Sequence, residues 1–352
     1  MQNVKRVLVL GAQVPFVRGG AELLNESLLK EINKLQGIKA ELVQLPFKWY
    51  PEEQMLNDLA AWRLLDISEA NGNKIDLVIG TKFPTYAVQH EKKILWLVHQ
   101  HRTLYDLENT QFDGLYSVKG SQHIRDKLRQ LDEKFIGECA KKYTIASNVT
   151  DRLKKFNGLT AQTLYPPAPF ADKIVSGDYG DYVLFIGRME ELKRPSLLIQ
   201  AMKQACKETK AYFIGTGIQK EQLARLIVEQ NLSARCKMLG YVSEEELVSY
   251  LAHCRAVFYA PYDEDYGYAT IEAFLAKKPV ITCTDSGEVT NIVHQTQSGF
   301  VVENDTTAIA AAIDAVYSLS NTELEQLAQA GYQFAKSITW DNVIKKLVLE
   351  NI

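Results

Sequence analysis

The sequence predicts an α/β fold made of two doubly wound domains, each a parallel sheet covered by helices. Short apolar runs alternate with longer amphipathic segments along the chain, a pattern typical of parallel sheets with helices on both faces. The alternation breaks at Tyr165-Pro166-Pro167-Ala168-Pro169, where the prolines prevent regular structure. Because 352 residues also exceed one ordinary domain, we expect domains over residues 1–167 and 168–335, followed by a closing helix over 336–352.

The N-terminal series opens with an apolar run that predicts a buried first strand. A signal peptide is the alternative, but the apolar part is too short and no small-residue cleavage site follows it. Strands are expected over residues 4–10, 38–45, 76–79, 93–98 and 143–146. Helices are expected over residues 21–35, 52–67, 121–142 and 148–156.

The C-terminal series repeats the same pattern after the proline-rich break. Its strands are expected over residues 182–187, 211–215, 236–240, 256–260, 279–282 and 299–302, with helices between them. The closing helices are expected over residues 307–319, 323–336 and 341–349. Since ligands bind at the carboxyl ends of strands in such sheets, we expect the two sheets to face each other across a shared cleft.

The composition argues against several classes of protein. A net charge of −3 gives no basic field for nucleic acid, and no apolar run reaches the roughly 18 residues of a membrane span. The cysteines form no C-x-x-C pair, so we expect free, packed thiols in a reducing cytoplasm. They are Cys139, Cys206, Cys236, Cys254 and Cys283.

The most informative segment, residues 261–279, joins an apolar strand to a helix. Gly267-Tyr268-Ala269 would occupy the first turn of that helix, where backbone N–H groups lack intrahelical acceptors and attract anions. Glu264 precedes this turn, and Glu272 lies about 7 Å along the helix axis at ~1.5 Å per residue. A phosphate at the helix start would have a carboxylate on either side, which suits a sugar nucleotide.

Glu272 is the less expected of the two carboxylates. Acidic residues before a helix complement its dipole, and this accounts for Asp263 or Asp265. It does not account for Glu272, which lies inside an otherwise apolar helix. A buried glutamate needs partners, and the hydroxyls of a ribose would supply them.

Three further loops follow predicted strands and suit a phosphate. Gly19 and Gly20 would let backbone amides approach it, although a flexible turn explains them too and the spacing does not fit a dinucleotide fingerprint. Arg188 and Lys193 would clamp a diphosphate, the alternative being two solvated surface cations. Gly217 marks another turn of close approach.

Two histidines, His99 and His101, end a predicted strand. A metal pair is one interpretation, but no cluster of carboxylates or cysteines with ligand spacing adjoins them. A structural role and contact with a substrate are the other two interpretations. We favour substrate contact, by His99, because it lies closer to the strand end.

Taken in order, these motifs resemble the retaining GT-B glycosyltransferases of the large glycogen-synthase-like group, the family 4 type. The hallmark of that group is a pair of glutamates with seven residues between them. Here the matching segments are Glu264 to Glu272, Tyr266-Gly267, Gly187-Arg188 to Lys193-Arg194-Pro195, and Gly19-Gly20-Ala21-Glu22. The resemblance covers essentially the whole chain.

The resemblance implies a nucleotide-sugar donor held mainly by the C-terminal domain. Arg188 and Lys193 would bind the diphosphate. Glu272 would bind the ribose, and Glu264 the hydroxyls of the donor sugar. The remaining donor contacts would come from Gly217, Tyr266, Gly267, Tyr268 and Ala269.

The N-terminal domain is expected to complete this site. By resemblance, Gly19 and Gly20 would close over the diphosphate and His99 would reach the sugar. The last helix, within residues 336–352, would pack back on the N-terminal domain.

The implied activity is retaining transfer of a hexose-type sugar from a UDP- or GDP-sugar to a glycan or lipid-linked acceptor, in bacterial surface polysaccharide or glycolipid synthesis. No cofactor or metal is expected, since the cations and the helix start would meet the charge that grows on the departing diphosphate. Asp263-Glu264-Asp265 has the Asp-x-Asp spacing of metal-dependent transferases, which we interpret as coincidence. The alternatives are a nucleotide-sugar epimerase and a catalytically silent nucleotide-sugar-binding subunit.

A lipid-linked acceptor would bring this cytoplasmic protein into peripheral contact with the inner face of the plasma membrane. Acidic residues are interleaved with the basic ones on the helix expected over residues 121–142, so a solvated helix face is the preferred interpretation. The basic residues concerned are Lys119, Arg125, Lys127, Arg129 and Lys134.

Overall fold

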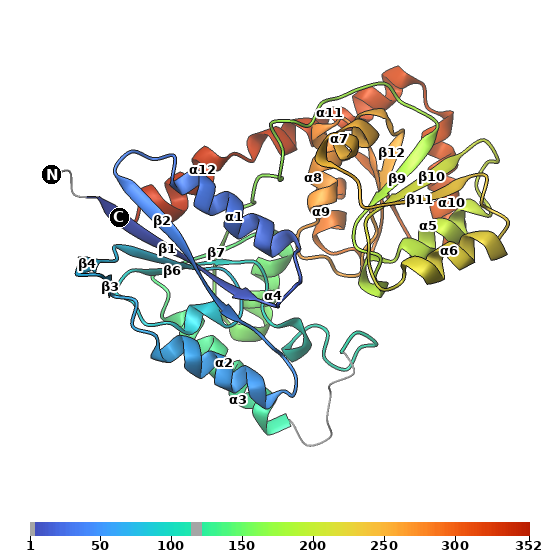
Figure 1. Ribbon diagram of the computed structural model, residues 1–352. Coiled ribbons are helices and arrows are strands. Elements are labelled where there is room, and N and C mark those ends of the chain that lie inside the picture. Colours follow the sequence, from blue (N-terminus) through green and yellow to red (C-terminus); the bar gives the residue numbers. More distant parts are fainter. Residues whose placement is uncertain (1–3, 114–121) are drawn as a thin grey trace. The chain divides into compact units, whose positions relative to one another are not determined.

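The computed structural model describes residues 4–113 and 122–352, which form two compact units. The first unit contains the chain up to Pro169 together with Thr339–Ile352, and the second contains Phe170–Ile338. Each unit is built on a six-stranded parallel sheet (Figure 1). The prediction of two doubly wound α/β sheets is therefore confirmed.

The sheet of the first unit has the strand order β2-β1-β5-β6-β7-β8. Its strands are β1 (Lys5–Gln13), β2 (Ile38–Pro46), β5 (Leu77–Gly80), β6 (Lys93–Leu97), β7 (Lys141–Thr144) and β8 (Gln162–Thr163). The sequence did not predict β8 or a small antiparallel hairpin of β3 (Glu69–Ala70) and β4 (Asn73–Lys74). Both are two-residue strands, too short to leave a periodic pattern.

Helices cover both faces of this sheet, with α1 and α12 on one face and α2 and α3 on the other (Figure 1). The helices are α1 (Gly20–Ile32), α2 (Glu53–Leu64), α3 (Gln122–Gly137), α4 (Ser147–Asn157) and α12 (Trp340–Ile344), which continues as a π-helical turn over Lys345–Leu349. Short 3₁₀ turns span Thr85–Ala87 and Arg102–Leu104. The ring of Trp340 meets the buried ring of Trp96 edge-on, with centroids 6.3 Å apart, and so fastens the C-terminal segment to the sheet of this unit.

The sheet of the second unit has the order β11-β10-β9-β12-β13-β14. Its strands are β9 (Tyr182–Ile186), β10 (Lys210–Ile214), β11 (Cys236–Gly240), β12 (Ala256–Phe258), β13 (Val280–Cys283) and β14 (Gly299–Val302). The chain extends the sheet outward from β9 in one direction and then returns to lay β12 on the other side of β9. The β9/β12 boundary is thus the topological switch point, where open α/β sheets bind ligands.

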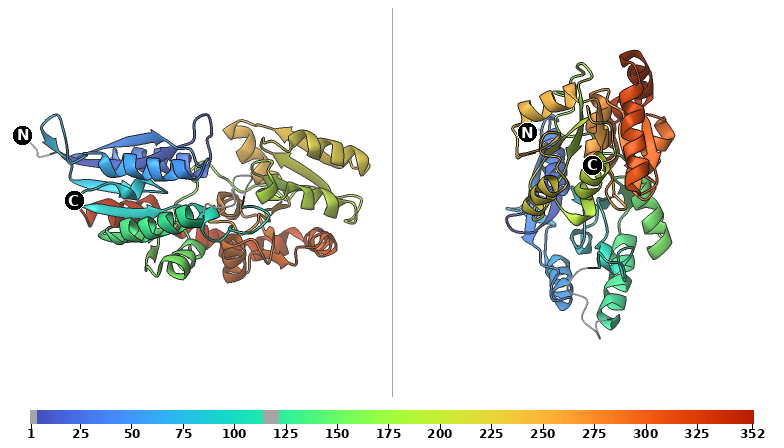
Figure 2. Two further views of the ribbon diagram at one scale, coloured as in Figure 1. Left: turned by 90° about the horizontal axis from the view of Figure 1, so that it is seen from below. Right: turned by 90° about the vertical axis from the view of Figure 1, so that its right-hand side faces the viewer.

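Two layers of helices enclose the second sheet. α5, α6 and α10 lie on one face, and α8, α9 and α11 lie on the other (Figure 1, Figure 2). The helices are α5 (Pro195–Met202), α6 (Lys220–Glu229), α7 (Glu244–His253), α8 (Tyr268–Leu275), α9 (Glu288–Thr296), α10 (Thr306–Ser318) and α11 (Asn321–Ser337). Fully buried Phe185, Phe213 and Phe258 anchor one apolar core of this unit.

Gly331 allows α11 to lie close against α8. A Cβ at this position would come within 2.8 Å of the Phe274 ring and of Ser298 Cβ. The Gly331 N–H also donates to Ser298 Oγ at 2.7 Å. The position of α8, which carries Glu272, therefore depends on a residue without a side chain.

Two expectations about individual side chains were wrong. Cys206 is exposed rather than packed, because it follows α5 at the surface, whereas the other four cysteines are buried. Arg125 is 5% exposed and donates twice to Glu52 Oε1, at 2.9 and 2.6 Å, so it does not belong to a solvated helix face. Lys119 lies outside the described residues.

Among residues 4–113 and 122–352, no helix is both long enough and apolar enough to cross a bilayer.

We expect Gly331→Ala to lower the free energy of unfolding by about 1–3 kcal/mol, because the added methyl group overpacks the contact between α11 and α8. Thermal unfolding followed by circular dichroism measures this effect. Gly137→Ala is the matched control, since nothing lies within 4 Å of a Cβ at that helix position. Equal midpoints for both variants would contradict the close contact.

Candidate functional site

The candidate site lies at the carboxyl edge of the second sheet, beside the β9/β12 boundary. After β9 come a short loop, a 3₁₀ turn over Glu191–Lys193, and α5. After the adjacent β12 comes the segment over residues 259–267, which leads into α8. The strand order therefore brings together two segments that are far apart in the sequence.

Lys193 and Glu264 form an ion pair that joins these two segments. Lys193 Nζ donates to Glu264 Oε2 and, at 3.2 Å, to the hydroxyl of Tyr259, which donates to the same Oε2 at 3.2 Å. Burial acts to lower the pKa of Lys193, but the charge of Glu264 outweighs it and the pKa is raised. Lys193 therefore remains a cation, and its side chain, 17% exposed, is held in place.

Arg194 holds the segment that carries Glu264, a role that the sequence analysis did not assign. Its guanidinium forms two bonds with the Asp285 carboxylate, at 2.7 and 2.6 Å. It also donates to the carbonyls of Ala260 at 2.7 Å and Pro261 at 2.9 Å. No local pattern could have paired Arg194 with Asp285, because 91 positions separate them.

The start of α8 requires a glycine. Gly267 has φ +83°, and a Cβ there would lie 2.8 Å from both the Tyr259 ring and Val289 Cγ2. The ring of Tyr266 packs edge-on against that of Tyr268, with centroids 5.3 Å apart. The first N–H groups of α8, including that of Ala269, have no acceptor within the helix and so form an electropositive end.

Glu272 is buried in α8, with 8% exposure. Among the described residues its carboxylate has no hydrogen bond and no ion pair. Burial raises its pKa to about 7. The pKa of Tyr268, one turn earlier, is raised by burial and then by the charge of Glu272. A buried carboxylate without partners is costly, and hydroxyl groups of a ligand would offset that cost.

Arg188 and Lys193 are not held together by any described contact. Arg188 pairs instead with Glu190, with Nη1 2.5 Å from Oε1, and its side chain is 54% exposed. Its long side chain therefore lies in solvent, with a carboxylate partner that an anionic ligand would have to replace.

The glycine at Gly217 is explained by packing against the backbone of the neighbouring loop. It has φ +154°, and a Cβ there would come within 2.5 Å of the Met189 carbonyl oxygen. Met189 N–H donates to the Thr216 carbonyl at 2.8 Å, and Gln219 N–H donates to the Met189 carbonyl at 3.0 Å. The loops after β9 and β10 are thereby joined.

Gly19, Gly20 and His99 all lie in the first unit, so the described contacts do not bring them together with the residues above. Gly19 is the N-cap of α1, and its N–H donates to Glu22 Oε2 at 2.9 Å. Glu22 also pairs with Lys82 at 2.9 Å. The glycine loop is thus closed by a carboxylate, and an anion would compete with it for the Gly19 amide.

His99 follows β6 and is half-buried, with Nδ1 2.6 Å from the Gln100 carbonyl oxygen. Burial, followed by the charge of His99, lowers the pKa of His101 to about 3. The neutral ring of His101 packs edge-on against Phe47 and Phe83. Over the described part of the chain, no three His, Cys, Asp or Glu side chains are grouped so as to hold a metal ion.

Two apolar side chains at the carboxyl edge were not singled out from the sequence. Ile218, 91% exposed, follows β10, and Tyr241, 85% exposed, follows β11. The Gly215 N–H donates to the Gly240 carbonyl at 2.8 Å, so the two loops are neighbours. Their only sequence signal is an apolar residue after a glycine turn.

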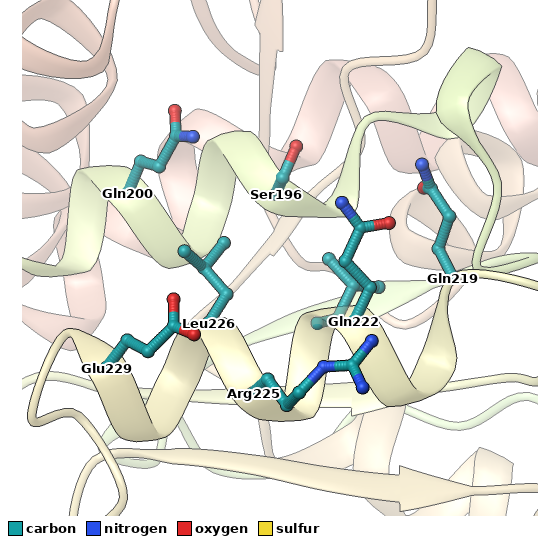
Figure 3. A pocket seen from close by; sticks show the side chains of 8 residues that line it. Ser196, Gln200, Gln219, Gln222, Arg225, Leu226 and Glu229 are labelled. Atoms are coloured by element: carbon teal, nitrogen blue, oxygen red, sulfur yellow. The ribbon is translucent and has the colours of Figure 1, made fainter.

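A hollow of about 300 Å³ lies between α5 and α6 (Figure 3). Three of its eight lining side chains are glutamines, and it contains none of the residues assigned to the site. It is lined by Ser196, Gln200, Gln219, Gln222, Leu223, Arg225, Leu226 and Glu229.

Glu272 is expected to give the protein a specific pH dependence. Between pH 4.5 and about 7 the unfolded chain loses a proton that the folded chain keeps, so stability falls as the pH rises and the loss is complete above pH 7. Across that pH interval the free energy of unfolding falls by about 3 kcal/mol on account of Glu272. Glu272→Gln lacks this titrating group, so its free energy of unfolding should gain on that of the wild type as the pH rises from 4.5 to about 7. Urea denaturation at a series of pH values measures the difference.

The exposed Glu229→Gln variant is the control and should show no such trend. Parallel pH profiles for Glu272→Gln and the wild type would contradict the burial of an unpartnered carboxylate.

Several known proteins are similar to parts of this chain. The model of the family described as "Glycosyl transferases group 1" matches residues 171–334. An uncharacterized glycosyltransferase of Methanocaldococcus jannaschii is 27% identical over 235 residues, which are 65% of this chain and 61% of the relative. The O-antigen chain mannosyltransferase B of Escherichia coli is 29% identical over 168 residues, 46% and 43% of the two chains. The chain thus spans about three fifths or less of the length of these relatives.

Solved structures match nearly the whole chain. Sucrose-phosphate synthase from Thermosynechococcus elongatus has a TM-score of 0.77 at 15% identity and covers 97% of each chain. HepE of Anabaena in complex with UDP-glucose has a TM-score of 0.70 at 16% identity and covers 98% of each chain. At these identities the likeness concerns the fold. The chain has the GT-B type of fold, and residues 171–334 are similar to the family described as "Glycosyl transferases group 1".

Proposed function

We propose that this protein is a retaining glycosyltransferase that moves a hexose-type sugar from a UDP- or GDP-sugar to a glycan or lipid-linked acceptor. The observation that supports this best is the buried carboxylate of Glu272, which has no hydrogen bond or ion pair among the described residues and lies in the helix that follows Glu264. It lies in the segment that matches the group 1 model. HepE, which shares the fold, is known with UDP-glucose bound.

In this proposal the donor lies along the β9/β12 boundary. Lys193 and Arg188 bind the diphosphate, and the amides at the start of α8 add to their positive field. Glu272 accepts hydrogen bonds from the ribose, and Glu264 accepts them from the donor sugar. Tyr266, Gly267, Tyr268 and Ala269 form the wall at the helix start, and Gly217 shapes the neighbouring loop.

The reaction breaks the anomeric C–O bond through an oxocarbenium-like state, and negative charge grows on the departing diphosphate. Cations and helix amides aimed at that charge stabilise the transition state more than the ground state. The proposed transfer therefore uses no metal. Glu264 is assigned to sugar hydroxyls, so we favour attack from the same face over a double displacement through a carboxylate nucleophile.

The first unit is proposed to serve the acceptor. His99, at the carboxyl end of β6, would contact the donor sugar. Gly19 and Gly20 would bind the diphosphate through their backbone amides once the Gly19 N–H no longer donates to Glu22. The E. coli relative is named for O-antigen chains, which supports a role in surface polysaccharide or glycolipid synthesis. A lipid-linked acceptor would involve the cytoplasmic face of the membrane.

We expect Arg188→Ala, Lys193→Ala and Glu264→Ala each to lower turnover at least tenfold, which corresponds to about 1.4 kcal/mol of transition-state stabilisation. The folded state should persist, as circular dichroism can verify. Arg225→Ala, which removes an exposed cation from α6, is the control and should retain full activity. Near-wild-type transfer by all three site variants would exclude this assignment.

Two successive experiments can identify the donor and then the stereochemistry of transfer. Thermal shifts with UDP-, GDP-, ADP-, CMP- and dTDP-sugars should single out a UDP- or GDP-sugar. NMR of the product should then show that the donor's anomeric configuration is kept. An inverted product would exclude the retaining mechanism. Conversion of the donor without an acceptor would indicate an epimerase, and binding without turnover a silent subunit.

A further inference from the structure

Tyr259 lies between the two segments of the candidate site and has been assigned no role. It directly follows β12 and is 5% exposed. One edge of its ring would lie 3.8 Å from a Cβ atom added to Gly187. The opposite edge would lie 2.8 Å from a Cβ atom added to Gly267. The ring therefore fills the space between the end of β9 and the start of α8.

The hydroxyl of Tyr259 contacts both members of the ion pair. It accepts from Lys193 Nζ at 3.2 Å and donates to Glu264 Oε2 at 3.2 Å. Burial and then the charge of Glu264 raise the pKa of this hydroxyl, so it stays protonated and able to donate. Lys193 Nζ also lies 5.7 Å from the centroid of the ring.

We propose that Tyr259 is a positioning residue, whose hydroxyl fixes the Lys193 ammonium and the Glu264 carboxylate relative to each other for glycosyl transfer. This inference rests on the proposed function of the site. A salt bridge alone has no fixed geometry, because an ammonium is a compact charge that rotates freely. A third group that bonds to both partners restricts them to one arrangement.

The number of available donors supports this role. An ammonium has three N–H donors, and within the described residues Lys193 uses two of them, on Glu264 and Tyr259. One donor is left for a phosphate oxygen. When the Lys193 ammonium also binds a diphosphate, its attraction to Glu264 weakens. The Tyr259 hydroxyl still donates to Glu264 and keeps that carboxylate in place for the sugar.

Tyr259→Phe separates this role from simple packing, because it keeps the ring and removes only the hydroxyl. We expect kcat to fall about tenfold while the KM for the donor changes less than about threefold, with the folded state retained in circular dichroism. In a Glu264→Gln background the same change should have little further effect, since the group being positioned is already altered. Tyr212→Phe, elsewhere in this unit, should leave kcat unchanged.

A second measurement needs no activity. Acylation of Lys193 at pH 9, followed by peptide mass spectrometry, should be several-fold faster in Tyr259→Phe and Glu264→Gln than in the wild type and Tyr212→Phe. Labelling and kcat equal to the wild type in Tyr259→Phe would overturn the inference. A wild type that transfers no sugar from any donor would instead reject the proposed function, and the labelling rates would still decide whether Tyr259 fixes Lys193.

Discussion

The bonds between Arg194 and its partners hold together the loops that follow β9, β12 and β13. The guanidinium uses its planar fork on the Asp285 carboxylate and two further N–H groups on the carbonyls of Ala260 and Pro261. Such charge-assisted, bidentate contacts are strong and directional. At 10% exposure they are also little screened by solvent. The segment that carries Glu264 therefore has a fixed position before any ligand arrives.

The buried charges at this edge differ in how they are compensated. Lys193 and Glu264 neutralise each other and share the hydroxyl of Tyr259. Glu272 has no such partner among the described residues, and its pKa is raised to about 7. The first arrangement compensates both charges within the protein, whereas the second leaves a buried carboxylate uncompensated by any described residue.

Much of the fold could be predicted from the sequence, because strand–helix alternation and proline breaks are local signals. The expected central strands and most helices are present within a few residues, and the helix start at Gly267 lies where its motif predicts. The two-residue strands β3, β4 and β8 could not be predicted, since they leave no periodic pattern. The burial of Arg125 was missed as well, because its partner Glu52 is remote in the sequence.

For the site, the sequence by itself determined which residue types follow which strands: Lys193 after β9, Glu264 and Glu272 around the start of α8, and glycines where the backbone turns. Only the tertiary structure decided their partners. It paired Lys193 with Glu264 beside the Tyr259 hydroxyl, fixed the loop of Glu264 with Arg194 and placed Arg188 beside Glu190. It left the Glu272 carboxylate without a hydrogen bond or ion pair among the described residues. The physical reason is that contacts across neighbouring parallel strands link residues some 70 to 90 positions apart, a distance over which no local pattern carries information.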